Sequence, residues 1–558
     1  MSGVQNEIPT IWTTGWTDVL NTGTWRAAVP VHEWRPSPCH VQCPVGGSLP
    51  AWIAQIGEGA YRDAWLTVVE NNPLPAVTGR VCHHPCEANC NRAALEGPVG
   101  VNALEHFLGD YALEQGWSFP EPPAPLGKRV AVVGGGPAGL GCAYHLRRLG
   151  YEVTIFEARA ELGGLLRYGI PEYRLPKAVV AREVQRILAM GVEAHTRTPV
   201  PDADALSRLQ QEYDAVFLAV GAQRAKRLTH LAESAGEGRV LEGLAFLRRV
   251  NDGEVVALGR RVVVIGGGSA AVDVARTARR LGKAVTIVAL EGRDALPAQA
   301  EEVVEALEEG IVLFAGAMVA GVDASGDALE LDCRKVTLDP EAPPGVLRPI
   351  PVEGSDFRLE ADTIIVSIGQ DPALEPFASL LQVEQAIIQV GGDFSTSRPG
   401  VFAGGDVATI VRFVSEALGD GRRAAQGIAA YLGHPEARVV PRLGLDQAVS
   451  RDDVNLFYFS PTDRRERAKA TASERVEDFR EIARALTAAE AAAEAGRCLS
   501  CGTCVECDNC FVFCPDMAVQ KDATRDQHYF ILDQYCKGCG LCVAECPRGA
   551  VRLEQESR

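Results

Sequence analysis

Ten of the 17 cysteines lie between Cys498 and Cys546. Eight of them form two runs, and in each run three cysteines separated by two residues are followed by a fourth cysteine and a proline. This spacing is typical of a segment that binds two [4Fe–4S] clusters, with the fourth cysteine of each run bound to the other cluster. A structural zinc site needs only four thiolates, so zinc does not explain eight. The predicted ligands are Cys504, Cys507, Cys510 and Cys546 for one cluster, and Cys514, Cys536, Cys539 and Cys542 for the other.

Five further cysteines stand towards the N-terminus, at Cys39, Cys43, Cys82, Cys86 and Cys90. Between the two groups the sequence has only Cys142 and Cys333, which we expect to be ordinary buried residues. A chain of this size in a reducing compartment needs no disulfides. The clustering at both ends therefore indicates metal-binding domains on either side of a catalytic core.

A glycine-rich turn follows the strand pattern of residues 130–133 and leads into a helix pattern. Glycines here permit a tight turn, a close approach of the backbone to a pyrophosphate, and close packing of the helix. A second strand pattern, residues 153–156, ends in Glu157, whose carboxylate is placed to bind a ribose. The predicted nucleotide contacts are Gly134, Gly136, Pro137, Ala138, Gly139 and Glu157.

The same pattern recurs after residues 262–265, with a second strand at residues 285–288. Two such folds in one chain predict two dinucleotides, a flavin that stays bound and a nicotinamide that exchanges. The plain alternative is that one of the two folds is degenerate and holds no ligand. The predicted contacts of the second fold are Gly266, Gly268, Ser269, Ala270 and Ala271.

Composition limits the remaining possibilities. The chain has 558 residues and a formal net charge of -18, which argues against nucleic acid or an anionic membrane as a partner. No stretch approaches the roughly 20 apolar residues of a membrane span. Residues 1–16 lack the basic-then-apolar order of a signal peptide, so we expect a cytoplasmic protein.

These patterns predict a multidomain fold. It combines an N-terminal α-helical Fe–S domain, two Rossmann-like α/β dinucleotide-binding domains for FAD and NAD(P), and a C-terminal α+β bacterial-type ferredoxin domain. We expect the helical domain over residues 1–124, the FAD-binding domain over 125–255 and 371–435, the NAD(P)-binding domain over 256–370, a mostly helical linker over 436–497, and the 2x[4Fe-4S] ferredoxin domain over 498–558.

Two segments resemble the glutamate synthase small-subunit family, which includes the electron-input half of dihydropyrimidine dehydrogenase. Residues 161–177 resemble its flavin-side signature, and residues 396–406 match its second FAD signature. The resemblance implies that Asp406 contacts the ribityl chain of FAD and that Arg174 lies beside the flavin, whereas Lys177 is either near the flavin or on the surface. Further predicted cofactor contacts are Gly164, Leu165, Gly405, Ile368 and Gly369.

The sequence departs from this family where the coenzyme ribose binds. Members that use NADP usually carry Tyr-Arg-Arg after the second strand of the nicotinamide fold, and here the positions read Ala289-Leu290-Glu291. The carboxylate of Glu291 repels a 2′-phosphate and pairs with a free 2′-hydroxyl. NAD is therefore favoured, while Arg293 is close enough to keep NADP as an alternative.

The N-terminal cysteines resemble the family's two-cluster helical domain, but its first Cys-x2-Cys pair is absent there. A matching segment occurs instead at residues 494–501. Our hypothesis is that the C-terminal segment folds back. It would place Cys498 and Cys501 with Cys39 and Cys90 in one cluster, while Cys43, Cys82, Cys86 and, by resemblance, Glu105 hold another.

Fifteen cysteines and Glu105 then supply the 16 ligands of four clusters. Three or two clusters remain alternatives, with the spare cysteines structural. Glu105 is alternatively a solvated helix residue, and His83 and His84 are more typical of surface residues than of ligands.

These parts predict an FAD- and iron–sulfur-dependent NAD(P)H:acceptor oxidoreductase subunit. Hydride transfer between rings needs positioning and exclusion of water, so no acid–base pair is expected. No substrate domain is visible, so the partner is expected to be ferredoxin or a larger oxidoreductase subunit in a hetero-oligomer. The alternatives are the small subunit of a glutamate synthase and a non-enzymatic electron-wiring module.

Overall fold

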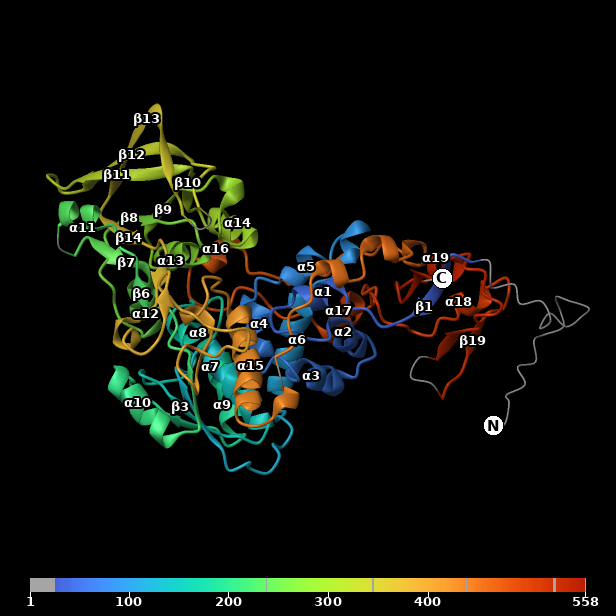
Figure 1. Ribbon diagram of the computed structural model, residues 1–558. Helices are drawn as coiled ribbons and strands as arrows, with labels where there is room; N and C mark the ends of the chain where they lie inside the picture. Colours follow the sequence, from blue (N-terminus) through green and yellow to red (C-terminus); the bar gives the residue numbers. More distant parts are fainter. Residues whose placement is uncertain (1–25, 237, 344–345, 438, 525–527, 557–558) are drawn as a thin grey trace, which may run out of the picture.

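The computed structural model describes residues 26–236, 238–343, 346–437, 439–524 and 528–556. Residues 1–16, for which we expect no signal peptide, lie outside the described residues. Figure 1 shows two α/β units at one end, a helical domain in the middle, and a small domain with β1, α18, α19 and β19 at the other end. Within the described residues no helix has the length and apolar character needed to span a membrane.

The first α/β unit, here called the flavin unit, is built on a five-stranded parallel sheet in the order β18-β5-β2-β3-β4. Its central strands are almost wholly apolar because helices cover both faces of such a sheet. Strand β18 comes after the whole second unit in the sequence but pairs in the first sheet. The flavin unit is therefore built from two separate stretches of the chain. The strands are β2 (Arg129–Val133), β3 (Glu152–Phe156), β4 (Glu193–His195), β5 (Ala215–Leu218) and β18 (Val401–Ala403), and the helices are α7 (Pro137–Arg148), α8 (Leu165–Tyr168), α9 (Lys177–Leu188), α10 (Ala203–Glu212) and α15 (Val414–Tyr431).

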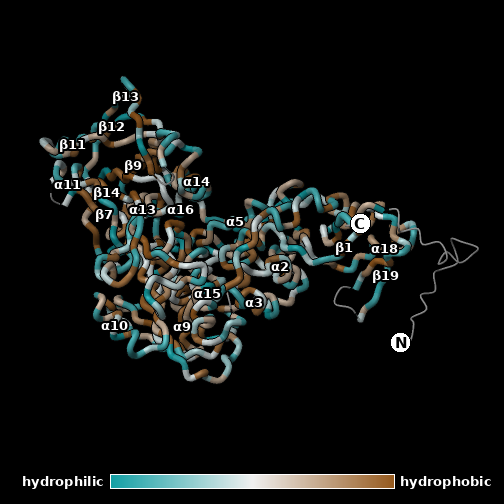
Figure 2. Tube along the Cα trace, in the orientation of Figure 1, coloured by the Kyte–Doolittle hydropathy of each residue, from teal (hydrophilic) through white to brown (hydrophobic). Residues whose placement is uncertain are grey.

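The second α/β unit, here called the nucleotide unit, has the sheet order β10-β9-β8-β14-β7. A three-stranded antiparallel sheet packs beside it, and the outer end of β13 is hydrophilic (Figure 2). The main sheet contains β7 (Val240–Glu242), β8 (Arg261–Ile265), β9 (Ala284–Ala289), β10 (Val312–Ala315) and β14 (Thr363–Val366). The second sheet contains β11 (Ala317–Asp323), β12 (Leu329–Leu338) and β13 (Pro349–Ala361). The helices are α11 (Thr229–Ala235), α12 (Gly243–Asn251), α13 (Ser269–Arg280) and α14 (Ala300–Glu308).

The expected boundary at residue 255 differs from this architecture. Strand β7 pairs with β14, and α12 packs on α13, so both belong to the nucleotide unit although they precede residue 256. The chain passes between the units at a two-stranded pair, β6 (Arg224–Ala225) with β15 (Gln370–Asp371). A three-residue edge strand gives too short a pattern to be assigned from sequence.

The middle domain is helical, and α4 and α6 cross in close contact. A Cβ on Gly79 would fall 2.3 Å from the backbone nitrogen of His106, and one on Gly109 would fall 2.4 Å from that of Ala76. Glycine is therefore required at both crossing points. The helices are α1 (Pro38–Gln42), α2 (Leu49–Gly57), α3 (Tyr61–Val69), α4 (Pro75–Val81), α5 (Pro85–Ala88) and α6 (Val101–Glu114).

The small domain at the far end, here called the ferredoxin domain, borrows a strand from the start of the chain. Strand β1 (Ala28–His32) pairs antiparallel with β21 (Val551–Gln555). Residues 28–32 therefore belong to this domain and not to the helical domain expected over residues 1–124. The other elements are α18 (Asn509–Val512), β19 (Val519–Lys521), β20 (Tyr529–Ile531) and α19 (Leu541–Ala544).

Residues 436–497 were expected to be mostly helical, and the structure differs. Apart from short 3-10 turns, the described part forms only α16 (Ala472–Arg475) and α17 (Ala488–Ala495), and the rest is extended or irregular. Helix α17 packs on α2 and α6. The reason is that residues 460–486, here called the crossing segment, run over both the helical domain and the nucleotide unit instead of packing on themselves.

Candidate functional site

A cavity of about 640 Å³ lies where the two α/β units meet, within the size range of ligand-binding pockets. Both units and the helical domain contribute to its wall. From the flavin unit it is lined by Gly134, Gly136, Pro137, Ala138, Glu157, Gly164, Leu165, Arg174 and Asp406, from the nucleotide unit by Ser269, Ala270 and Asp273, and from the helical domain by Val81 and His83. We call it the central cavity.

The glycines of the first turn have separate structural roles. Gly134 has a φ of +107°, and a Cβ there would lie 2.3 Å from the carbonyl oxygen of Ala219. A Cβ on Gly139 would lie 1.9 Å from the carbonyl oxygen of Gly134, so α7 packs directly on the turn. Gly136 has only Gly164 within 4 Å of such an atom, which leaves the turn open to the central cavity. This arrangement fits a pyrophosphate at the start of α7.

Two acids of the flavin unit face the same cavity. Glu157 is buried, and its carboxylate accepts hydrogen bonds from the backbone nitrogens of Gly135 and Arg159, both at 2.8 Å. Asp406 follows Gly405, whose φ of +71° turns the chain towards the cavity. Burial raises the pKa of Asp406 to about 6, against the opposing charge of Arg412. Both carboxyl groups thus line the central cavity, and acceptors of this kind fit the hydroxyls of a dinucleotide.

The second turn is built in the same way. Gly266 has a φ of +139°, and a Cβ there would lie 2.2 Å from the carbonyl oxygen of Ser367. A Cβ on Gly267 would lie 2.7 Å from Oε2 of Glu291, so this carboxylate lies against the turn. Ser269 Oγ is buried and has no hydrogen-bond partner among the described residues. An unpaired donor at the start of α13 fits a phosphate oxygen.

The other residues predicted for the nucleotide unit lie around this turn. Arg293 is exposed at the start of a 3-10 turn, Arg293–Ala295. Gly268 has open space where a Cβ would be, whereas Ala271 is buried in the core of the unit. Ile368 and Gly369 do not line the central cavity, but Gln370, the next residue, does.

Arg174 joins the two units. Its guanidinium pairs with Asp273 of α13 at 2.7 Å and with Glu302 of α14. Burial opposes its charge, but these carboxylates outweigh burial and raise its pKa. Lys177 is not a surface residue: its Nζ donates to the carbonyls of Ile170, Leu166 and Leu175, the last two at 3.3 and 3.2 Å. Burial lowers its pKa to about 8.

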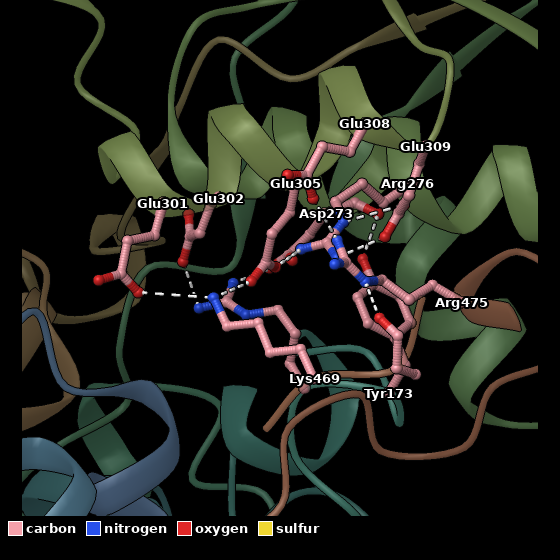
Figure 3. Close-up of polar contacts among 12 residues, drawn as sticks. Tyr173, Asp273, Arg276, Glu301, Glu302, Glu305, Glu308, Glu309, Lys469 and Arg475 are labelled. Carbon is pink, nitrogen blue, oxygen red and sulfur yellow. Dashed lines mark hydrogen bonds and ion pairs between the residues drawn. The ribbon is translucent and has the colours of Figure 1, made fainter. Parts of the chain in front are cut away.

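Figure 3 shows a network of charges beside Arg174, shared by α13, α14 and the crossing segment. Arg276 is fully buried and pairs with Glu309 at 2.6 Å and with Glu305 at 2.8 Å. Arg280 pairs with the same Glu309 at 2.8 Å and lies 3.7 Å from the ring centre of Tyr173. Residue Tyr173 comes from the flavin unit, so the network fixes the two units against each other.

A wall one chain thick separates the central cavity from a smaller cavity of about 50 Å³. At the end of α4 and just beyond it, Val81 and His83 line the central cavity, while Cys82 and His84 line the smaller one. The His83 ring lies 4.1 Å from that of Phe413, which also lines the central cavity. These four neighbouring residues thus divide between the two cavities.

The smaller cavity is surrounded by Cys43, Cys82, Cys86 and Glu105, here called quartet 1. Glu105 is half-buried, and Asn72 Nδ2 donates to its Oε1 at 2.7 Å. Burial raises its pKa to about 7, and it is no solvated helix residue. The pKa of the Cys82 thiol is raised to about 12, by burial first and then by Glu105.

The fold-back segment reaches the helical domain. Burial raises the pKa of the Cys39 thiol well above its usual range, and the neighbouring thiols of Cys498, Cys90 and Cys501 raise it further. We call these four cysteines quartet 2. Glu494 at the end of α17 anchors the segment, because its Oε1 accepts from the backbone nitrogen of Gly100 at 2.7 Å.

The ferredoxin domain brings its cysteines together in the two interleaved groups that the sequence predicts. Cys510 has Cys504, Cys546 and Cys507 as charged neighbours, and these four form quartet 3. Cys542 has Cys514, Cys536 and Cys539, and these four form quartet 4, which lines a further small cavity. In both cases burial is the largest cause that raises the pKa of the central thiol, to about 12.

The quartets follow one another in a single order. Cys86 of quartet 1 has Cys39 of quartet 2 among its charged neighbours. Arg548 lies between thiols of quartets 2 and 3, and Cys510 of quartet 3 has Cys542 of quartet 4 as a neighbour. Beginning at the central cavity, the order is therefore 1, 2, 3, 4.

All 17 cysteines are free thiols, as cluster ligands must be. Among the described residues, no group of three or more His, Cys, Asp or Glu side chains could hold a single metal ion. A [4Fe–4S] cluster places an iron–sulfide cube between its thiolates and so needs a wider opening than one ion. The cavities within quartets 1 and 4 fit that requirement better than a closed zinc site does.

Sequence reasoning missed several residues of this site. Arg548 and the pair of His83 with Phe413 carry no local pattern, because their places depend on contacts between distant segments. The carbonyls around Lys177 are likewise supplied by the fold. Asn72 lies in a segment that resembled the helical domain, and that resemblance was the one available signal for it.

Three family models match the chain. Residues 128–421 match the pyridine nucleotide-disulphide oxidoreductase model, residues 33–117 match dihydropyrimidine dehydrogenase domain II with its 4Fe-4S cluster, and residues 493–547 match a 4Fe-4S dicluster domain. The matches cover the two α/β units, the helical domain and the ferredoxin domain in turn.

Curated relatives align over most of the chain. It is 36% identical over 499 residues to the subunit beta of an NADP(+)-dependent formate dehydrogenase of Moorella thermoacetica, covering 83% of this chain and 70% of the relative. It is 33% identical over 503 residues to the subunit beta of an NADPH-Fe(3+) oxidoreductase of Geobacter sulfurreducens, covering 83% and 75%. It is 34% identical over 419 residues to the small chain of a glutamate synthase [NADPH] of Azospirillum brasilense, covering 70% and 86%.

Proposed function

This chain belongs to the pyridine nucleotide-disulphide oxidoreductase family, in a branch with the small chains of glutamate synthases, and we propose that it is the nucleotide-handling subunit of a larger redox complex. It is an FAD- and iron–sulfur-dependent NAD(P)H oxidoreductase. The relatives named above are subunits or chains of larger assemblies. That pattern supports a partner subunit that carries the terminal donor or acceptor, and ferredoxin is the alternative partner.

The residues of the site have two roles: some would hold the cofactors, and others fix the two α/β units against each other. Bound FAD would accept a hydride from the nicotinamide and release single electrons, and bound [4Fe–4S] clusters would carry them. The first turn and Glu157 would hold FAD, and the second turn with Ser269 would hold the nicotinamide nucleotide. Arg174, through Asp273, fixes the two units so that both ligands would meet in one cavity.

One observation supports this function most directly: the wall formed by residues 81–84. Cys82 faces quartet 1, and its neighbour His83 faces the central cavity. A flavin in that cavity would be separated from the first cluster by one side chain. The remaining quartets then lead away in order to the ferredoxin domain, which lies at the end of the molecule opposite to the α/β units (Figure 1).

We further propose four clusters, held by quartets 1 to 4, and a preference for NAD over NADP set by Glu291. The place of Glu291 against the second turn supports that preference. The names of the relatives, which specify NADP or NADPH, point the other way. A titration that compares the two coenzymes decides between them.

The function is tested by anaerobic titration of the purified chain with NADH and NADPH, followed by absorbance and EPR. We expect bleaching of the flavin, EPR signals of reduced clusters, and about 16 iron atoms per chain, four for each cluster. Gly268→Val should retain flavin and iron, because a Cβ there meets nothing within 4 Å, yet NADH should no longer reduce it.

Gly392→Val is the matched control, since Gly392 also has open space around its Cβ position and lies outside the nucleotide unit. It should behave as the native chain does. Failure of both coenzymes to bleach the native flavin would contradict the enzymatic proposal and favour a non-enzymatic wiring module. About 12 iron atoms would reject the fourth cluster.

A further inference from the structure

Arg548 occupies the junction between the helical domain and the ferredoxin domain. It follows Cys546 of quartet 3 by two residues, but its side chain turns back to the segment that carries quartet 2. Its Nη1 donates to the carbonyl of Cys498 at 3.4 Å and to that of Leu499. Its own carbonyl accepts from the backbone nitrogen of Gly502 at 2.6 Å. The residue thus binds the fold-back segment from both its side chain and its backbone.

The guanidinium of Arg548 has thiols of two different quartets as its charged neighbours. They are Cys498 and Cys501 of quartet 2 and Cys507 and Cys546 of quartet 3. No carboxylate among the described residues forms an ion pair with it. Its Nε is buried without a hydrogen-bond partner among those residues, and the ring of Phe459 lies 5.0 Å from its guanidinium carbon. Its charge is therefore directed at thiolates and is not cancelled by an acid.

A cationic charge beside an iron–sulfur cluster stabilises the reduced form, which carries one more negative charge. The reduction potential of the cluster rises accordingly. The effect is larger at a half-buried place than at the surface, because less water screens the charge. A single cation between two clusters acts on both of them and keeps their potentials close together.

We propose that Arg548 is a positioning residue for electron transfer between the domains, because its cation raises the reduction potentials of the two clusters held by quartets 2 and 3. The inference rests on the proposed function, since it requires clusters in these quartets. It assigns to one side chain the step at which electrons leave the helical domain for the ferredoxin domain. No cysteine of quartets 1 or 4 is among its main charged neighbours.

The experiment is an EPR-monitored redox titration of the cluster-loaded full chain. In Arg548→Gln, two of the signals should move to lower potential, with a tenfold or larger fall in the reduced-to-oxidised ratio at a fixed potential, which corresponds to 59 mV for one electron. The other two signals should stay in place. Cys90→Ser and Cys507→Ser, made separately, identify which signals belong to quartets 2 and 3.

Arg548→Lys keeps the positive charge but loses the planar pair of N–H donors. The reduction potentials of the two clusters should therefore stay close to those of the native chain, even where the variant weakens the junction between the domains. Arg552→Gln removes the same charge from β21 at a half-exposed residue paired with Glu33, and should shift no signal. Equal potentials in native chain and Arg548→Gln would overturn the inference, as would a uniform shift of all four signals. If Arg548→Lys and Arg548→Gln shifted the reduction potentials equally, Arg548 would have only a structural role.

The two proposals fail separately. A native chain without iron or EPR signals contradicts the proposed function. A loaded native chain, active with a pyridine nucleotide and unchanged in potential by Arg548→Gln, contradicts only the role of Arg548.

Discussion

Glu105 and Lys177 show what burial does to single charged residues in this chain. The sequence left open that both residues lie on the surface. In the structure, both are held by specific hydrogen-bond partners. Glu105 accepts from Asn72 beside three cysteines, and Lys177 donates to backbone carbonyls of the loop after α8. A charged side chain without water needs such partners. Glu105 depends on Asn72, which is distant in sequence, and Lys177 depends on the turn formed by the residues just before it; no local pattern reveals either contact.

At the residue scale, the proposed preference for NAD rests on Glu291. Glu291→Gln removes the negative charge beside the second turn, so repulsion of a 2′-phosphate falls and the charged hydrogen bond to a 2′-hydroxyl is lost. With about 1.5–3 kcal/mol for such a bond, the NADH-to-NADPH ratio of kcat/KM should fall by roughly tenfold or more. Steady-state kinetics with both coenzymes measures it.

The control for this change is Asp294→Asn, which removes an exposed charge three residues away and should leave the ratio unaltered. A native chain that already prefers NADPH would show that Arg293, and not Glu291, governs the ribose site.

At the scale of elements, α13, α14 and the crossing segment form one electrostatic unit. Lys469 pairs with Glu305 at 2.6 Å and Arg475 with Glu308 at 2.8 Å. The backbone nitrogen of Ile482 donates to the carbonyl of Tyr173 at 3.1 Å. The crossing segment therefore touches the nucleotide unit and the flavin unit together. Its irregular backbone is what allows it to follow both surfaces.

Glu309 is the anion on which this unit depends. Glu309→Ala leaves the buried Arg280 without a carboxylate and Arg276 with Glu305 alone, at a cost of about 3–5 kcal/mol in the free energy of unfolding. Chemical denaturation monitored by circular dichroism should show that loss. Glu308→Ala, which removes a half-exposed partner, should cost less than 1 kcal/mol.

The same residue predicts a dependence on pH. Burial opposes the charge of Glu309, but Arg276 and Arg280 outweigh burial and lower its pKa below the usual range. A lowered pKa stabilises the fold above the pKa of the unfolded chain, and this stability is lost as pH falls through the folded value. Glu309→Gln should flatten the acid limb of a stability-against-pH curve, and an unchanged limb would contradict the assignment.

At the scale of the whole molecule, quartet 2 joins segments from both ends of the chain. The two glycine-rich turns and the C-terminal cysteine runs were predictable from sequence, since each is a local pattern. The pairing of β1 with β21 and the place of β7 in the nucleotide sheet were not, because both depend on long-range contacts. The fold-back of Cys498 and Cys501 was reached through resemblance and a ligand count.

Shared clusters give a quantitative prediction for pairs of cysteines. Cys39→Ala and Cys498→Ala should each remove about four iron atoms, and the double variant should remove no more, because both residues belong to quartet 2. Cys39→Ala with Cys86→Ala should remove about eight. Iron analysis of the purified variants measures this, and Cys142→Ala is the control with native iron.

Additive iron loss in the double variant of Cys39 and Cys498 would show that these residues serve different clusters. The structure would then have to accommodate a separate site for the fold-back segment.

The pairing of β1 with β21 also affects folding during synthesis on the ribosome. Residues 28–32 emerge early and must wait, unpaired, until residues 551–555 have been translated. The side chains of quartet 1, all within residues 43–105, are available to receive iron long before the fold-back segment exists. The side chains of the cluster proposed nearest the flavin are therefore translated first, and the strand pairing of the outer domain can form only last.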